Sequence, residues 1–549
     1  MATAKYICGI GAAVLFCAAN SAFATDLRVA DAAQRDDRKG VASLLQDKAD
    51  VNAAQGDGMT ALHWAAAHGD ADLVKDLLAA GANVKAVTRD EALTPLFIAS
   101  SSGKAAVIEE LLRAGADAES PDALGTTALM SAAHSGNVEV VKALLDHGAK
   151  INAAESHGQT ALMFAAAENR ADAIKLLVAR GADTKITTSV TRLEKPKFDE
   201  DGNPLPEKPA PKPGAAPPSA AAAAQAARRA SATKIGGMTA LILAARDDRR
   251  EAVRALLDAG ADINEAGAGD KTTPMLIAIV NGHYDLAKFL LDHGANPNVL
   301  NEDGLAPLYA VEDNQYAPIG WSPNPIIAQE KIGYLDLMKA LLDRGADPNV
   351  RLTKKLWYRP TNHDQMWVGS AGSTAFWRAA QATDLAAMHL LVAHGADPKI
   401  PSNEGDNALM VAAGLGWAGN FSINAGDSPL DVVKYCLELG VDPTPQDVQG
   451  FTALAGAAWR GQNELVKLLV EKGAKLDART TRGWSVTDMA MGPSLRTSVP
   501  IQHPDTAQLL TSLGAPPLTA VEGEEILGII KGEAPALKAA KAAGETHQQ

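Results

Sequence analysis

The sequence predicts an all-α solenoid, built as a stack of helix-turn-helix units joined by finger loops. Three observations support this prediction. A Thr-Ala-Leu or Thr-Pro-Leu signal returns along the chain, most often every 33 or 34 residues, a Leu-Leu…Gly-Ala signal closes each unit, and aromatic residues make up only 4% of the 549 residues. A core of alanine and leucine with few rings is typical of closely packed helices. A fixed period of this length is typical of repeat architectures.

Ahead of the first unit, the chain has the features of a secretory signal peptide. Lys5 supplies a positive charge, residues 6–19 form an apolar run, and Ala22-Phe23-Ala24 is a small-residue cleavage motif. We expect cleavage after Ala24 and an exported chain, either periplasmic or secreted. No apolar stretch reaches the roughly 18 residues that a membrane-spanning helix needs, so no membrane span is predicted.

The first half of each unit is predicted to be a helix that begins at the marker position. A threonine there can cap the helix with its hydroxyl group, and a following proline fits the first turn because no amide donor is needed there. The marker position is occupied in turn by Thr60, Thr94, Thr127, Thr160, Thr239, Thr273, Ala306, Thr374, Asn407, Thr452 and Ser485.

The second half of each unit is predicted to be a helix with paired leucines that ends at a glycine. In Leu77-Leu78-Ala79-Ala80-Gly81, the leucines fill the space between layers and the glycine adopts the left-handed conformation that stops the helix. An extended finger then leads to the next unit. With an atypical opening unit at 26–50, we count twelve units over residues 26–517.

These signals resemble the ankyrin repeat. Its Thr-Pro-Leu-His-x-Ala motif is best matched at Thr60-Ala61-Leu62-His63-Trp64-Ala65, whereas the histidine is missing from the other copies. The poorest copy, 484–515, is the last one, as expected of a capping unit. The resemblance implies protein recognition on a concave face formed by finger tips and first helices. Candidate contacts at the tips are Asp57, Arg89, Glu91, His157 and Asp303.

Insertions interrupt the period. The longest contains closely spaced prolines and an alanine tract, and such a segment cannot bury a core. The predicted order along the chain is a signal peptide at 1–24, amino-terminal repeats at 25–185, a Pro/Ala-rich disordered insertion at 186–235, carboxy-terminal repeats at 236–517 with insertions at 315–332, 351–372 and 416–428, and a tail at 518–549.

Tryptophan is concentrated in and near the later insertions, since five of the eight lie between Trp321 and Trp417. One interpretation is a recognition patch, because tryptophan, tyrosine and arginine anchor many interfaces. The other is that each long insertion needs a small core of its own, which a tryptophan can supply. The residues predicted to bind a partner are Trp321, Trp357, Tyr358, His363, Asp364, Trp367 and Trp417.

No catalytic motif was found in the sequence. It contains no Gly-x-Ser-x-Gly, His-Glu-x-x-His, Cys-x-x-Cys or phosphate-binding glycine loop. We therefore predict a protein that is not an enzyme, with no catalytic residue, no cofactor and no metal site. Cys436 is expected to be a small core residue. Histidines that precede glycine, such as His147, His293 and His394, are expected to stabilise helix ends.

The charge balance bears on the class of partner. The chain has 51 Lys+Arg against 65 Asp+Glu, a net charge of −14 that repels phosphate backbones and argues against a nucleic-acid partner. We predict an exported, monomeric scaffold that binds a protein of unknown identity on its concave finger and inner-helix surface. The alternative is a ligand-binding or regulatory module with a small-molecule site built by the aromatic-rich insertions. That alternative requires the rings to converge on a pocket with polar groups nearby.

Overall fold

The computed structural model describes residues 26–193, 233–316, 327–354, 356, 368–417, 424–492 and 501–518. The predicted signal peptide lies outside these residues, and so does the predicted tail except for Leu518. The chain divides into two compact units. Unit 1 runs to Ser189 and also contains Thr239–Ala244 and Arg249–Ala261, and unit 2 contains the remainder.

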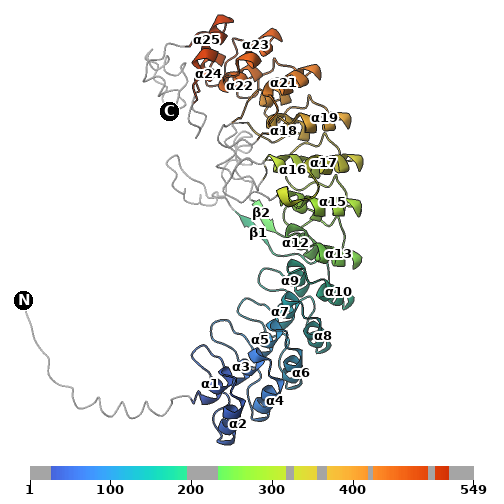
Figure 1. Cartoon of the computed structure of the whole chain (residues 1–549), viewed down its shortest axis with the longest axis vertical. Helices are drawn as coiled ribbons and strands as arrows, with labels where there is room; N and C mark the ends of the chain where they lie inside the picture. The colour runs from blue at the N-terminus through green and yellow to red at the C-terminus, as the bar shows by residue number, and fades with distance from the viewer. Residues whose placement is uncertain are drawn as a thin grey trace, which may run out of the picture. The chain divides into compact units, whose positions relative to one another are not determined.

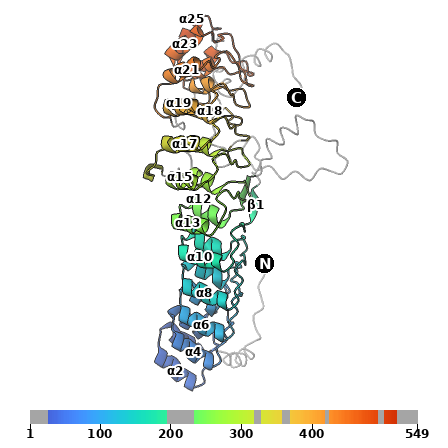
Figure 2. The same cartoon turned by 90° about the vertical axis from the view of Figure 1, so that its right-hand side faces the viewer.

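Unit 1 consists of helix pairs stacked in sequence order. Its first helices are α1 (Arg28–Gln34), α3 (Ala61–His68), α5 (Pro95–Ser101), α7 (Ala128–Ser135) and α9 (Ala161–Ala167). Its second helices are α2 (Arg38–Gln46), α4 (Ala71–Ala79), α6 (Ala105–Arg113), α8 (Val138–Asp146), α10 (Ala171–Ala179) and α13 (Arg250–Asp258). Each first helix packs against the next, and α13 packs against α10, so the stacking resumes after the longest insertion. Figures 1 and 2 show finger loops, first helices and second helices of this unit as separate rows.

Unit 2 repeats the same arrangement. Its first helices are α14 (Pro274–Val280), α16 (Pro307–Gln315), α18 (Ala375–Ala382), α20 (Ala408–Ala412), α22 (Ala453–Trp459) and α24 (Val486–Ala490). Its second helices are α15 (Tyr284–Asp292), α17 (Tyr334–Asp343), α19 (Leu385–Ala393), α21 (Pro429–Glu438), α23 (Asn463–Glu471) and α25 (Pro504–Ser512). Helix α12 (Ala240–Arg246) precedes α13 and has residues in both units, and the 3₁₀ helix η2 (Ile327–Gln329) precedes α17.

Two short strands lie at the ends of the segment that the sequence predicts to be disordered. Strand β1 (Val190–Leu193) pairs antiparallel with β2 (Thr233–Gly236), with Val190 opposite Gly236. The rest of the insertion falls outside the described residues. The two ends of the predicted insertion therefore form paired strands.

The predicted side-chain caps are present at most of the marker positions, although Thr160 and Ala306 make no such bond. The hydroxyl oxygen of Thr94 accepts a hydrogen bond from the Phe97 N–H at 3.1 Å, and that of Thr452 accepts one from Ala455 at the same distance. At the other end of the unit, Gly81 has φ 91°, the left-handed conformation expected of the glycine that follows a second helix. Capping side chains and left-handed glycines, both predicted from the sequence, thus mark the helix boundaries.

The core consists of small residues on the first helices and leucines on the second. Ala65 and Ala66 of α3 are fully buried, as are Leu77 of α4 and Leu111 of α6. Burying one leucine side chain stabilises a fold by about 1.5–3 kcal/mol relative to exposure. Helices this short are marginal in isolation, so each layer depends on its neighbours.

The structural roles predicted for histidine and cysteine are confirmed. The Nδ1 atom of His147 lies 2.9 Å from the Ala143 carbonyl oxygen, and His293 and His394 make the same contact one helical turn back. These rings therefore contact carbonyls in the last turns of second helices, where the helix dipole places partial negative charge. Cys436 is buried, and burial raises the pKa of its thiol to about 12, as expected of a core residue.

Candidate functional site

Successive finger loops of unit 1 are joined at their tips. Each junction is a single backbone hydrogen bond of 2.7–3.2 Å from one tip to the preceding one. The donor and acceptor pairs are Arg89 to Asp57, Ala123 to Glu91, Ser156 to Leu124 and Ser189 to His157. The tips thus form a continuous row, which we call the finger row of unit 1. Four of the tip residues predicted from the sequence, Asp57, Arg89, Glu91 and His157, lie on it and are exposed.

The first helices of unit 1 expose part of the face next to this row. The residue four positions after the marker is half-buried in four successive units, at Trp64, Ile98, Ser131 and Phe164. The Trp64 indole N–H donates to the Gln55 side-chain oxygen at 2.8 Å, and Gln55 belongs to the adjoining finger. The Phe164 ring meets His134 edge-on with centroids 6.4 Å apart. Apolar rings and polar finger groups therefore share one surface.

The corresponding positions of unit 2 are buried. They are Ile277, Ala310, Arg378, Val411, Gly456 and Met489. Arg378 is the only charged residue among them, and its Nε donates to the Asp313 carboxylate at 3.0 Å. Among the described residues, the accessible first-helix face therefore belongs to unit 1.

The finger row of unit 1 is rich in carboxylates. Asp57, Asp90 and Glu91 are exposed at its first two junctions, and Arg89 donates through Nη1 to the Gly56 carbonyl at 2.8 Å. Burial raises the pKa of Glu155, but hydrogen bonds from His157, Gln159 and Ser156 outweigh this effect and lower it overall. Glu155 is consequently ionised at neutral pH and adds to the negative charge of the finger row.

Six of the residues predicted to bind a partner lie outside the described residues: Trp321, Trp357, Tyr358, His363, Asp364 and Trp367. The seventh, Trp417, is half-buried. The Arg460 guanidinium lies 4.6 Å from its ring centroid, and the Trp459 indole N–H donates to the Trp417 carbonyl at 3.1 Å. Burial lowers the pKa of Arg460 to about 10. Trp417 therefore meets two residues that the sequence did not single out.

Another tryptophan of the same stretch belongs to the core. Trp377 is 1% exposed, and its indole N–H donates to the Asp406 carbonyl at 3.0 Å. Trp377 lies in the first helix α18 and so belongs to the core of a regular unit, where its buried indole has the hydrogen-bond acceptor that it needs.

A polar cluster that sequence reasoning missed lies among α16, α17, α18 and α19. The Asp384 carboxylate accepts hydrogen bonds from the hydroxyl groups of Tyr316 at 2.8 Å and Tyr334 at 2.7 Å. Tyr316 follows α16 and Tyr334 begins α17, so both ends of the insertion between these helices are fixed to the next layer. The signal that could have revealed this was the tyrosine at each end of the inserted segment.

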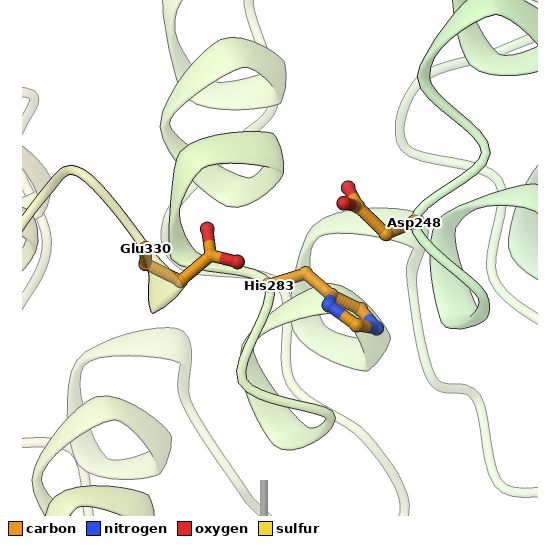
Figure 3. Close-up of side chains that lie close together, drawn as sticks. All are labelled: Asp248, His283 and Glu330. Carbon is orange, nitrogen blue, oxygen red and sulfur yellow. The ribbon is translucent and has the colours of Figure 1, made fainter. Parts of the chain in front are cut away.

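A second missed cluster consists of Asp248, His283 and Glu330, which come from three separate segments (Figure 3). One ligand-type atom from each side chain lies within 4.8 Å of the others, and all three residues are half-buried. These residue types can hold a metal ion. In sequence they are 35 and 47 residues apart, so no local motif indicates them.

The protein is a stack of helix pairs, and the finger tips of unit 1 are joined in a row. This architecture is typical of repeat scaffolds that bind through an extended surface. The chain belongs to the ankyrin-repeat family, as the sequence resemblance indicated. A family model of ankyrin repeats, covering three copies, matches residues 29–122, 96–188, 222–301, 267–352 and 376–480. Ankyrin repeats are protein–protein interaction modules. None of the described helices is both long enough and apolar enough to cross a membrane.

Curated relatives match through their repeats. Ankyrin repeat and SOCS box protein 16 of Mus musculus is 42% identical over 98 residues, which is 18% of this chain and 19% of that protein. Alpha-latrocrustotoxin-Lt1a of Latrodectus tredecimguttatus is 26% identical over 246 residues, 44% of this chain and 14% of the toxin. The B-cell lymphoma 3 protein homolog of Mus musculus is 29% identical over 115 residues, 21% of this chain and 22% of that protein. The chain thus spans less than a quarter of the length of each relative.

Proposed function

We propose that the protein is an exported, non-enzymatic scaffold that binds a protein partner on the finger row and first-helix face of unit 1. The observation that supports this most strongly is the half-buried series at Trp64, Ile98 and Phe164, which runs beside exposed carboxylates. Aromatic anchors surrounded by polar groups are typical of protein interfaces. The signal-peptide features of residues 1–24 support export.

The chemistry of this surface favours one kind of partner. Exposed Asp57 and Glu91 attract a basic segment, and the rings beside them can receive apolar side chains. A segment that carries both lysine or arginine and apolar residues satisfies both features. Charge complementarity of this sort raises the association rate and adds specificity.

Affinity capture from the exported fraction, followed by titration of the purified partner, tests the proposal. The bait is the mature chain, whose mass should match cleavage after Ala24. We expect Asp57→Lys with Glu91→Lys to weaken binding at least tenfold, because two carboxylates facing a basic segment become cations. The matched control is Glu139→Lys with Asp72→Lys, which reverses two exposed acids in the first turns of α8 and α4 and should leave binding unchanged.

A separate arm tests the aromatic insertions as a second contact region. The bait Trp357→Ala with Trp367→Ala should lose the partner if the predicted residues take part in binding. Equal recovery by wild type and this double variant would exclude those residues. Equal recovery by wild type and the tip variant would refute the proposed surface on unit 1.

A further inference from the structure

Asp248 occupies a turn position that most other units give to glycine. It follows α12 with φ 52°, and the equivalent residues Gly69, Gly103 and Gly136 have φ values of 68–78°. Left-handed backbone favours glycine, although aspartate and asparagine tolerate it. At this turn the chain therefore carries a carboxylate where most units carry no side chain.

His283 is the N-cap residue of α15, and one of its ring nitrogens is already engaged. Its Nε2 lies 3.0 Å from the Arg246 carbonyl oxygen, which can only accept, so Nε2 carries the proton in the neutral ring. The other nitrogen, Nδ1, is then unprotonated and able to bind a cation. A backbone carbonyl that holds the second ring nitrogen is the usual support of a histidine ligand.

Hydrogen bonds in both directions join the segments of Glu330 and Asp285. Its carboxylate accepts a hydrogen bond from the Asp285 N–H at 2.7 Å, and the Asp285 carboxylate accepts bonds from the N–H groups of Lys331 and Ile332 at 3.1 Å. Glu330 directly follows η2 and belongs to the insertion between α16 and α17. The insertion thus brings a third ligand, a carboxylate oxygen, to a place where regular units have none.

We propose that Asp248, His283 and Glu330 bind a divalent transition-metal ion such as Zn²⁺. Imidazole favours the transition metals over Mg²⁺ and Ca²⁺, and two carboxylates supply negative charge that outweighs the partial positive charge at the start of α15. The ligand-type atoms, up to 4.8 Å apart, must move closer together to reach metal–ligand distances of about 2.0–2.2 Å. Three protein ligands leave one tetrahedral position for water or a partner group. The bound ion tethers the segment 327–332 to α15 and to the turn after α12.

Calorimetric titration of the purified chain with ZnCl₂, after removal of metals with a chelator, tests this site. The chain offers conservative variants. Asp248→Asn is expected to fold because Asn169 occupies the equivalent turn with φ 58°. His283→Asn is expected to retain a bond to the preceding unit, although to another carbonyl than that of Arg246, because Asn137, the equivalent residue, donates to the Gly103 carbonyl at 3.1 Å. Each variant should bind Zn²⁺ at least tenfold more weakly than wild type.

His293→Asn is the matched control, since its ring contacts a carbonyl of its own helix and lies outside the cluster. It should bind like wild type, and Zn²⁺ should raise the melting temperature of wild type and of this control alone. Titrations with MgCl₂ and CaCl₂ should show no saturable binding. Identical Zn²⁺ isotherms for wild type and both cluster variants would overturn the proposal, as would saturable Ca²⁺ binding that Asp248→Asn abolishes.

Discussion

Glu312 occupies a position where a charged side chain is out of place. Six residues after the marker, most units have an alanine, as at Ala66, Ala133, Ala166, Ala245, Ala380, Ala413 and Ala458. Glu312 is fully buried, and within the described part of the chain neither of its carboxylate oxygens has a hydrogen-bond partner. Burial, with a contribution from the nearby Asp384 charge, raises its pKa well above the ordinary 4.5. The folded protein therefore holds Glu312 in the neutral, protonated form.

This carboxyl group makes the stability of unit 2 depend on pH. The unfolded chain releases the proton above about pH 4.5, whereas the folded chain keeps it, so the free energy of unfolding decreases as the pH rises from 4.5. We expect Glu312→Gln, which is neutral at every pH, to be more stable than wild type at pH 7 by about 1 kcal/mol or more. Near pH 4 the two proteins should be similar. Urea denaturation between pH 4 and pH 8 measures this difference, and parallel pH profiles would contradict the assignment.

The sequence places Glu312 in the correct helix but does not reveal its state. Its distance from the marker identifies it as a first-helix residue, and the alanines at equivalent positions indicate a tight contact. Whether a hydrogen-bond partner reaches its carboxyl group depends on how α16 packs against α18. The nearby Asp384 belongs to another layer, 72 residues further along the chain. Asp248, His283 and Glu330 escaped prediction for the same reason, because side chains from separate segments meet only in the folded stack.

At the scale of the elements, an asparagine ladder joins successive layers. The Asn298 side-chain amide donates to the Gly345 carbonyl at 2.7 Å, and its oxygen accepts the Asp347 N–H at 2.8 Å. Asn349 binds Gly395 and Asp397 of the next layer in the same way. Each asparagine thus satisfies backbone groups just past the end of the following second helix, where such groups are otherwise unpaired.

Asn298→Ala should destabilise unit 2 by about 1–3 kcal/mol, because it removes two hydrogen bonds between layers. Its neighbour Asn296 is the matched control, since within the described segments its side chain accepts only the local bond from the Asn298 N–H. Asn296→Ala should therefore cost less. Chemical denaturation of both variants gives the comparison, and an equal loss of stability would show that the ladder contributes no more than a local turn.

Helices and connecting structure differ in how well the sequence predicts them. Helices such as α5 and α22 begin directly after a capping threonine and end where the period requires, because capping and glycine stops are local effects. The ladder was not anticipated, although its asparagines recur in the finger segments, because its acceptors lie in the next layer. The hairpin of β1 and β2 was missed since its strands are separated by the long Pro/Ala-rich insertion, which gives no turn signal close to either strand.

At the scale of the whole molecule, the repeated layers limit how far one change can reach. In unit 1, α8 packs against α6 and α10 on either side and against α7 in its own layer. Such proteins behave as linear arrays in which stability is the sum of layer terms and nearest-neighbour terms. This periodicity identifies the family and its general role in protein binding. The identity of the partner instead depends on exposed side chains, which the repeat pattern does not specify.

Leu144→Ala in α8 tests this local coupling. Leu144 is fully buried, and truncating a buried leucine costs about 2–5 kcal/mol because a cavity replaces its contacts. Hydrogen exchange followed by mass spectrometry should show reduced protection in α6, α7, α8 and α10, while α21 and α23 keep the protection of wild type. The effect should be confined in this way because the lost contacts are shared only by adjoining layers. A uniform loss of protection along the whole chain would instead show that the layers unfold as one cooperative body.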